Sequence, residues 1–220
     1  MSKCRDLNSH TAERGIYTGG FDSRGRRQGK GIFYFDSGDI YEGSFHRDFK
    51  HGIGTYKYAA GSSSYLIYNG NWKMDSIHGK GVLTFSNGDK YSGDFLNDEM
   101  HGNGVYEFSN GNIYNGGFKS GERNGKGVLL CVGGNEYDGQ WMDDMKHGAG
   151  ILTYANGDIY EGFFRLGFMN GHGTFRFGDG GLYCGEFSEG KIQGNGQFSY
   201  KNGEMEFVRW KGSKCLRNGC

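Results

Sequence analysis

The sequence has no long apolar run, no proline and no net charge. No stretch approaches the roughly 20 apolar residues that a membrane-spanning helix needs, and no charged-then-apolar leader opens the chain. We therefore expect an intracellular, soluble protein. Lysine plus arginine equals aspartate plus glutamate at 25 each, so no general field attracts the chain to nucleic acid or to an anionic membrane. Any such binding has to come from local patches.

Cysteine is scarce and shows no metal or disulfide spacing. The five cysteines include no Cys-x-x-Cys pair and are odd in number, which favours neither a disulfide framework nor a zinc module. Glycine is abundant, at 44 of 220 residues, and by itself would suggest flexible low-complexity chain. Two features oppose that interpretation, because the glycines are periodic and aromatic residues make up 16% of the chain.

A 23-residue repeat organises the chain, and Tyr91 to Ile113 is a typical copy. Each copy opens with Tyr-x-Gly-x-aromatic, and a Gly-x-Gly follows eleven residues after the tyrosine, or twelve in the first copy. The opening tyrosines are Tyr17, Tyr41, Tyr68, Tyr91, Tyr114, Tyr137, Tyr160 and Tyr183. Because the repeat extends from Tyr17 to Trp210, we expect no separate catalytic domain.

Each copy alternates with period two, which predicts strands rather than helices. Tyr91 and Phe95 share one face with the intervening glycine, and Gly102, Gly104 and Tyr106 share one face of the following strand. Glycine has no side chain to pack, so a strand rich in glycine needs cover. We expect aromatic rings from neighbouring strands to lie over the bare glycine backbone.

Turn signals divide each copy into a hairpin. Polar five-residue loops separate the two strands, as in Leu96 to Met100 and Met142 to Lys146. Asn-Gly pairs such as Asn110-Gly111 join successive copies and favour tight hairpin turns. The predicted fold is all-β, an elongated single-layer antiparallel β-meander of about eight hairpin repeats with a C-terminal capping strand. Its parts are a tail at residues 1–14, a ribbon at residues 15–210 and a second tail at residues 211–220.

The sequence resembles the MORN repeat family, whose pattern is approximately YEGEWxxGxxHGxGxxxxxNGD. The segments IYEGSFHRDFKHGIGTYKY and IYEGFFRLGFMNGHGTFRF carry the resemblance, which covers Tyr17 to Trp210. It implies an extended meander used as a docking scaffold, in some members on phosphoinositide-containing membranes and in others in cytoskeletal or ciliary assemblies. The opening YTGGFDSRGRRQGKG is similar to the start of the MORN protein of the ciliary radial spoke head.

Three binding hypotheses remain open at this stage. The first is a protein partner, as a helix or peptide, in a groove lined by Tyr91, Phe95, Tyr114, Phe118, Tyr137 and Trp141. The second is an anionic lipid surface bound by Arg24, Arg26, Arg27 and Lys30. The third is self-association through the terminal strands, whose edges are unpaired. The first predicts a cytoplasmic protein associated with the cytoskeleton or a cilium.

Catalytic and cofactor chemistry is not indicated. Histidines precede several Gly-x-Gly units, but equivalent positions in adjacent copies should lie about 9.5 Å apart, too far to share one zinc ion. The Gly-x-Gly units open no helix, as phosphate-binding loops do. No catalytic triad is evident, and the neutral charge disfavours base stacking on the rings. We expect no enzyme activity, no metal, no cofactor and no nucleic-acid partner.

Overall fold

The computed structural model describes residues 14–211 and 214–217, and every regular element there is a strand. The described residues contain no helix that could cross a membrane. The chain divides into two compact units, one ending at Glu122 and the other beginning at Arg123. We describe each unit by itself.

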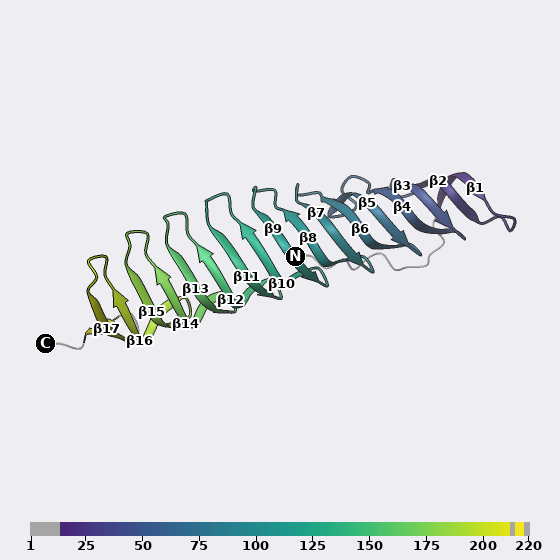
Figure 1. The fold of residues 1–220 in the computed structure, drawn as a ribbon. Coiled ribbons are helices and arrows are strands. Elements are labelled where there is room, and N and C mark those ends of the chain that lie inside the picture. The colour runs from purple at the N-terminus through teal and green to yellow at the C-terminus, as the bar shows by residue number, and fades with distance from the viewer. Residues whose placement is uncertain (1–13, 212–213, 218–220) are drawn as a thin grey trace. The chain divides into compact units, whose positions relative to one another are not determined.

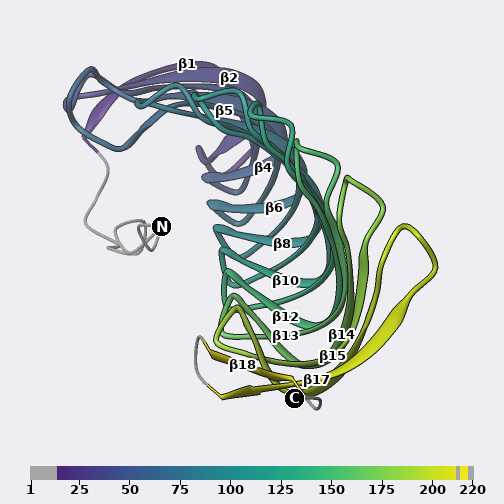
Figure 2. The same ribbon diagram turned by 90° about the vertical axis from the view of Figure 1, so that its left-hand side faces the viewer.

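The first unit is an antiparallel meander in which each strand pairs with the next (Figure 1). Figure 2 shows β4, β6 and β8 of this unit in order, side by side with their partners. The strands are β1 (Gly15–Phe21), β2 (Arg27–Phe35), β3 (Ile40–His46), β4 (Phe49–Lys57), β5 (Tyr65–Lys73), β6 (Ser76–Phe85), β7 (Lys90–Leu96), β8 (Glu99–Glu107) and β9 (Ile113–Lys119).

The second unit repeats the same pattern and confirms the predicted all-β meander. Its strands are β10 (Glu122–Leu130), β11 (Glu136–Met142), β12 (Met145–Thr153), β13 (Ile159–Arg165), β14 (Phe168–Arg176), β15 (Leu182–Ser188), β16 (Lys191–Ser199), β17 (Met205–Lys211) and β18 (Lys214–Arg217). The last strand lies inside the segment expected as a C-terminal tail and pairs with β17. Residues 1–13 of the expected N-terminal tail lie outside the described residues.

The opening tyrosine covers a glycine of the neighbouring strand, as predicted, and also a glycine of its own strand. In the hairpin of β7 and β8, Gly93 pairs with Gly104, and the Tyr91 ring lies over both. A Cβ atom added to either glycine would collide with the Tyr91 ring or hydroxyl group. The hydroxyl group donates a hydrogen bond of 2.8 Å to the Asp94 carbonyl oxygen. The glycines are therefore required by the ring, since any side chain would displace it.

The first glycine of each Gly-x-Gly has a different role from the one predicted. The register of β7 and β8 shifts at Asp94, which pairs with His101, and this bulge places Gly102 at a φ of 60°. A Cβ atom on Gly102 would meet the Asp94 side chain rather than a ring. Glycine is favoured here because its backbone adopts the left-handed region without steric cost.

The two kinds of turn also differ from the prediction. The expected five-residue loop at Leu96 to Met100 is a two-residue turn, in which Asn97 and Asp98 have φ values of 48° and 68°. Asparagine and aspartate tolerate this conformation, which matches the twist of the paired strands. The strands extend into the polar flanks because their backbone groups pair there. The expected loop at Met142 to Lys146 shortens to the turn Asp143-Asp144 in the same way.

At the Asn-Gly joins only the glycine takes a positive φ. Gly111 has a φ of 88°, and its N–H group donates to the Phe108 carbonyl oxygen at 2.8 Å. The Phe108 N–H group donates in turn to the Asn112 carbonyl oxygen at 2.9 Å. This longer turn, with one left-handed residue after the first bend, replaces the two-residue Asn-Gly turn predicted from the sequence.

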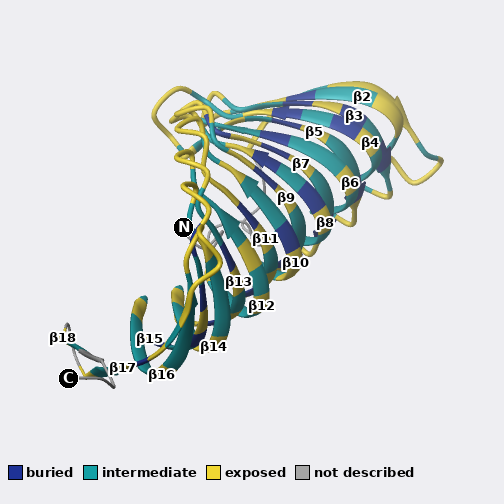
Figure 3. Ribbon diagram, turned by 60° about the vertical axis from the view of Figure 1, so that its left-hand side comes forward, coloured by how far each residue is buried: buried dark blue, intermediate teal, exposed yellow. Residues whose placement is uncertain are grey.

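The core is a zigzag of edge-to-face rings along one face of each unit. Within each unit an opening tyrosine typically contacts the Phe or Trp four residues on and the equivalent ring of the next repeat, as Tyr68 contacts Trp72 and Phe95, both at 5.3 Å between centroids. In the second unit Tyr160 contacts Phe164 and Phe187 likewise. Figure 3 shows the buried segments recurring from strand to strand. The largest fully buried side chains are Tyr41, Tyr68, Tyr91, Tyr114, Tyr137, Tyr160 and Tyr183.

Burial of these phenols predicts loss of stability in alkali. Desolvation raises the pKa of Tyr160 to about 12, and it raises the pKa of Tyr41, Tyr68 and Tyr91 above its usual value. A raised pKa means that the folded state holds the proton more tightly than the unfolded state. The contribution is therefore complete below about pH 10 and is lost as the pH rises through about 12.

Urea denaturation at a series of pH values, with phenolate absorbance recorded in parallel, tests this dependence. We expect the free energy of unfolding to fall progressively above about pH 10. Ionisation of every tyrosine near its ordinary pKa, with the far-ultraviolet circular dichroism unchanged, would contradict it.

Candidate partner-binding groove

A second row of rings lies on the same face, near the Asn-Gly ends of the strands. In the first unit its neighbouring centroids are 4.5–5.6 Å apart. Most of these rings are half-buried, unlike the opening tyrosines. We call this set the aromatic row, and it consists of Phe33, Phe35, Tyr56, Tyr58, Tyr65, Phe85, Tyr106 and Phe108.

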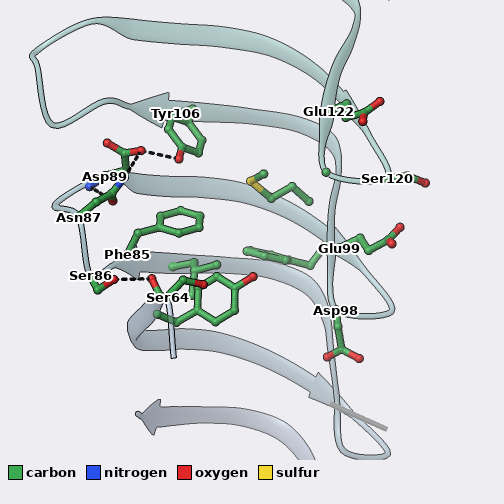
Figure 4. Close-up of a pocket in the computed structure, with 15 residues that line it drawn as sticks. Ser64, Phe85, Ser86, Asn87, Asp89, Asp98, Glu99, Tyr106, Ser120 and Glu122 are labelled. Atoms are coloured by element: carbon green, nitrogen blue, oxygen red, sulfur yellow. Dashed lines mark hydrogen bonds between the residues drawn. The ribbon is translucent and has the colours of Figure 1, made fainter. Parts of the chain in front are cut away.

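The aromatic row forms part of a pocket of about 300 Å³ in the first unit (Figure 4). The side chains that make it apolar are Tyr65, Leu83, Phe85, Phe95, Met100 and Tyr106. Its polar side chains lie at two ends. Ser64, Ser86, Asn87 and Asp89 lie at one end, and Asp98, Glu99, Ser120 and Glu122 lie at the other. We call this pocket the groove.

Asp89 anchors one end of the groove through a hydrogen-bond network. It accepts 2.7 Å bonds from the Tyr106 hydroxyl group and from the Ser109 N–H group, and a 2.9 Å bond from the Asn87 amide. Burial alone raises the pKa of Asp89, but these donors outweigh burial and lower the pKa below its usual value. Asp89 is therefore a fixed anion that also orients the Tyr106 ring.

Asp98 lies at the other end and is only 9% exposed. It is the second residue of the turn between β7 and β8, and it accepts a 2.7 Å hydrogen bond from the Ile77 N–H group. Burial raises the pKa of Asp98, while donors at Ile77 and Ser76 and the charge of Lys50 oppose that shift.

The six residues predicted to line a groove are buried in the core and do not form an accessible surface. Tyr91, Phe95, Tyr114, Phe118, Tyr137 and Trp141 are between 0% and 4% exposed. Among them only Phe95 lines the groove. Partner binding through these rings stays a prediction, and their burial leaves a partner little area to contact. The sequence signal for the aromatic row is the aromatic-x-aromatic pair at the end of a second strand, and in the pair Phe33 and Phe35 the second ring is the half-buried one.

The four basic residues predicted to bind lipid do not form a cluster of equivalent cations. Arg26 is paired with Asp22 at 2.6 Å. Arg27 lies over the Phe33 and Phe45 rings and donates a 2.7 Å hydrogen bond to the Asp48 carbonyl oxygen. The other two, Arg24 and Lys30, are exposed. Lipid binding here stays a prediction that rests mainly on these two exposed cations.

Residues 14–211 and 214–217 contain no candidate metal site. No group of three or more His, Cys, Asp or Glu residues in this part of the chain is placed to hold a metal ion.

Self-association through the terminal strands also stays a prediction.

Comparison with known families identifies the repeat. Eight segments match the MORN repeat, at residues 17–40, 41–63, 68–90, 91–113, 114–136, 137–159, 160–182 and 183–205. Each begins at one of the eight tyrosines that define the repeat in the sequence, so the predicted repeat boundaries are confirmed. No curated protein sequence matches the chain.

Several solved structures are similar to the chain at low sequence identity, and the first of the three named here has a TM-score above 0.5. The TCP10 domain of Danio rerio CPAP in complex with a peptide of Danio rerio STIL has a TM-score of 0.51 and 12% identity, covering 91% of this chain and 97% of that one. The wild-type TCP10 domain of Danio rerio CPAP has a TM-score of 0.46 and 12% identity, covering 86% and 87%. Virginiamycin B lyase from Staphylococcus aureus has a TM-score of only 0.21 and 11% identity, covering 89% and 74%.

Proposed function

Because the chain belongs to the MORN repeat family, we propose that it is a non-enzymatic docking scaffold whose groove holds a peptide segment of a protein partner. The observation that carries the proposal is the groove itself. It combines the half-buried rings of Tyr65 and Phe85 with a few fixed polar groups, which is the usual composition of a peptide-binding site. The aromatic row continues past the groove on either side, so an extended segment would find further ring contacts along the sheet.

A related fold in complex with a peptide supports this proposal. The Danio rerio CPAP domain was solved with a peptide of STIL, which demonstrates peptide binding for that protein. At 12% identity the likeness concerns the fold alone, and the residues that would bind are those of this chain.

We further propose that the scaffold is cytoplasmic and works in a cytoskeletal or ciliary assembly. The support is the resemblance of the first repeat, YTGGFDSRGRRQGKG, to the MORN protein of the ciliary radial spoke head. Tagging the protein in a ciliated cell tests this placement, and a tag found only away from the cytoskeleton would overturn it.

Site-specific crosslinking tests the docking function. We expect a photoreactive phenylalanine analogue at Phe85, in the groove, to crosslink a partner protein in cells. The same analogue at Tyr34 should not, since its neighbours Phe33 and Phe35 belong to the aromatic row and alternation places it on the opposite face. A Phe85→Ala variant should lose the partner in co-purification. Equal crosslinking at the two positions would contradict the groove assignment.

The lipid alternative rests on the exposed Arg24 and Lys30. Liposome flotation with and without anionic lipid, at two salt concentrations, separates it from docking, because electrostatic membrane binding must weaken with salt. Flotation that depends on anionic lipid and is lost in an Arg24→Glu, Lys30→Glu variant would favour the alternative.

A further inference from the structure

Four pairs of successive repeats are connected by an aspartate at the second position of the two-residue turn. This carboxylate accepts a hydrogen bond from a backbone N–H group of the preceding repeat. The bonds run from Arg27 to Asp48 at 2.8 Å, from Lys50 to Asp75 at 2.7 Å, from Ile77 to Asp98 at 2.7 Å and from Arg123 to Asp144 at 3.0 Å. We call these four acids the turn aspartates.

Three of the turn aspartates have a cation from the same residue that donates the N–H group. Arg123 Nε lies 3.0 Å from Asp144 Oδ1, Arg27 Nε lies 3.5 Å from Asp48 Oδ1, and Lys50 Nζ lies 3.9 Å from Asp75 Oδ1. Each cation also lies over aromatic rings, and the Arg123 guanidinium is 4.3 Å from the Trp141 centroid. The fold thus builds a recurring site for a cation between an aspartate and a ring.

Asp98 is the exception. The residue that donates its N–H group is Ile77, which is buried and uncharged. Within residues 14–211 and 214–217, no ion pair to Asp98 is formed. Burial raises the pKa of this carboxyl group, and the opposing charge of Lys50 acts on it from a side chain that is itself paired with Asp75. Asp98 is also the turn aspartate that lines the groove.

The groove as a whole is acidic, which also favours a cationic ligand. Four carboxylates line it, at Asp89, Asp98, Glu99 and Glu122, and its fifteen lining residues include no lysine, arginine or histidine. Figure 4 shows the last three of these acids at one end, with the rings of Phe85 and Tyr106 on the other side. An acidic end next to aromatic rings is complementary to a basic side chain flanked by apolar residues.

We infer that the partner segment supplies the missing cation, as a lysine or arginine side chain that enters the groove near Asp98, Glu99 and Glu122. The apolar residues beside it contact Tyr65 and Phe85, the two half-buried rings of the groove. This inference rests on the proposed docking function and specifies the partner as a basic and apolar peptide. The partner's cation would take the role that Arg27, Lys50 and Arg123 have in other repeats.

Peptide selection on the intact chain tests the inference. A display library of random twelve-residue peptides is selected on the wild-type protein, and recovered peptides are synthesised with each lysine or arginine kept or replaced by norleucine. We expect recovered peptides to share a basic residue, and the norleucine versions to bind at least about tenfold more weakly, since a charge in a desolvated site loses its partner.

Two variants of the protein probe the same contact from the other side. Asp98→Asn keeps an oxygen for the Ile77 N–H group but removes the charge, and Ile77→Lys supplies an internal cation as Lys50 does for Asp75. Each should weaken binding of the basic peptides about tenfold or more. The control Glu42→Gln removes an exposed charge on the other face and should leave binding unchanged. Far-ultraviolet circular dichroism confirms that each variant is folded.

The outcomes distinguish this inference from the function on which it rests. Recovered peptides that lack a basic residue, lose binding with Phe85→Ala and bind Asp98→Asn as well as wild type would overturn the inference and leave the docking function standing. If the library yields no peptide that binds through the groove, both the docking function and the inference fall.

Discussion

Replacing Tyr137 with alanine should lower the free energy of unfolding by about 3–5 kcal/mol, the usual cost of removing a large buried ring. The ring is 1% exposed and contacts Trp141 and Phe164 edge-to-face, with centroids 5.2 and 4.9 Å away. It also covers Gly139 and Gly150, which have no side chains of their own to pack. Removal of the ring therefore leaves a cavity and exposes the glycine backbone of both β11 and β12.

A Tyr137→Phe variant is the matched control. It keeps the ring and removes only the hydroxyl group, which donates a 2.8 Å hydrogen bond to the Gln140 carbonyl oxygen. We expect a loss of about 1 kcal/mol from this change. Urea denaturation, followed by tryptophan fluorescence and by far-ultraviolet circular dichroism, measures both variants. Because repeat arrays can unfold in steps, the two probes must be compared before a single free energy is assigned. Equal losses for the two variants would show that the hydroxyl group, rather than ring packing, dominates.

The second large effect is expected at Gly150, where one added methyl group should cost about 1–3 kcal/mol or more in an already filled core. A Cβ atom at this position would lie 2.6 Å from the Tyr137 hydroxyl oxygen and 2.7 Å from ring atom Cε2. The ring cannot move aside freely, because Trp141 and Phe164 hold its edges. Gly150→Ala should therefore lower the midpoint of urea denaturation although it adds apolar surface.

Gly133→Ala provides the comparison within the same unit. A Cβ atom at Gly133 meets nothing within 4 Å, and its φ is not among the positive values. Its effect should stay within about 0.5 kcal/mol, as for most surface substitutions. If the two alanine variants were equally stable, close approach of the tyrosine ring would not be the reason for glycine at position 150.

The turn aspartates show why the groove could not be derived from the repeat alone. Asp48 and Arg27 are 21 residues apart, as are Asp98 and Ile77, and the two pairs occupy equivalent places in the repeat. The spacing of about one repeat is visible in the sequence, but the contact between them depends on the register of three successive strands. Arg27 and Ile77 occupy equivalent positions, and the register shows that each faces a turn aspartate. The isoleucine therefore leaves Asp98 without the cation that Arg27 provides for Asp48.

Sequence alone determined the repeat, its strands and the pairing of aromatic rings with glycines, because period-two alternation and the 23-residue spacing from Tyr68 onward can be read directly from the chain. The tertiary structure decided which rings remain accessible. The Tyr91 ring is enclosed by Phe95 and by Phe118 of the next repeat, while Phe85 and Phe108 stay half-buried at the strand ends. The exposure of a ring depends on its contacts with side chains of other strands. The alternation of residues within one strand does not predict those contacts.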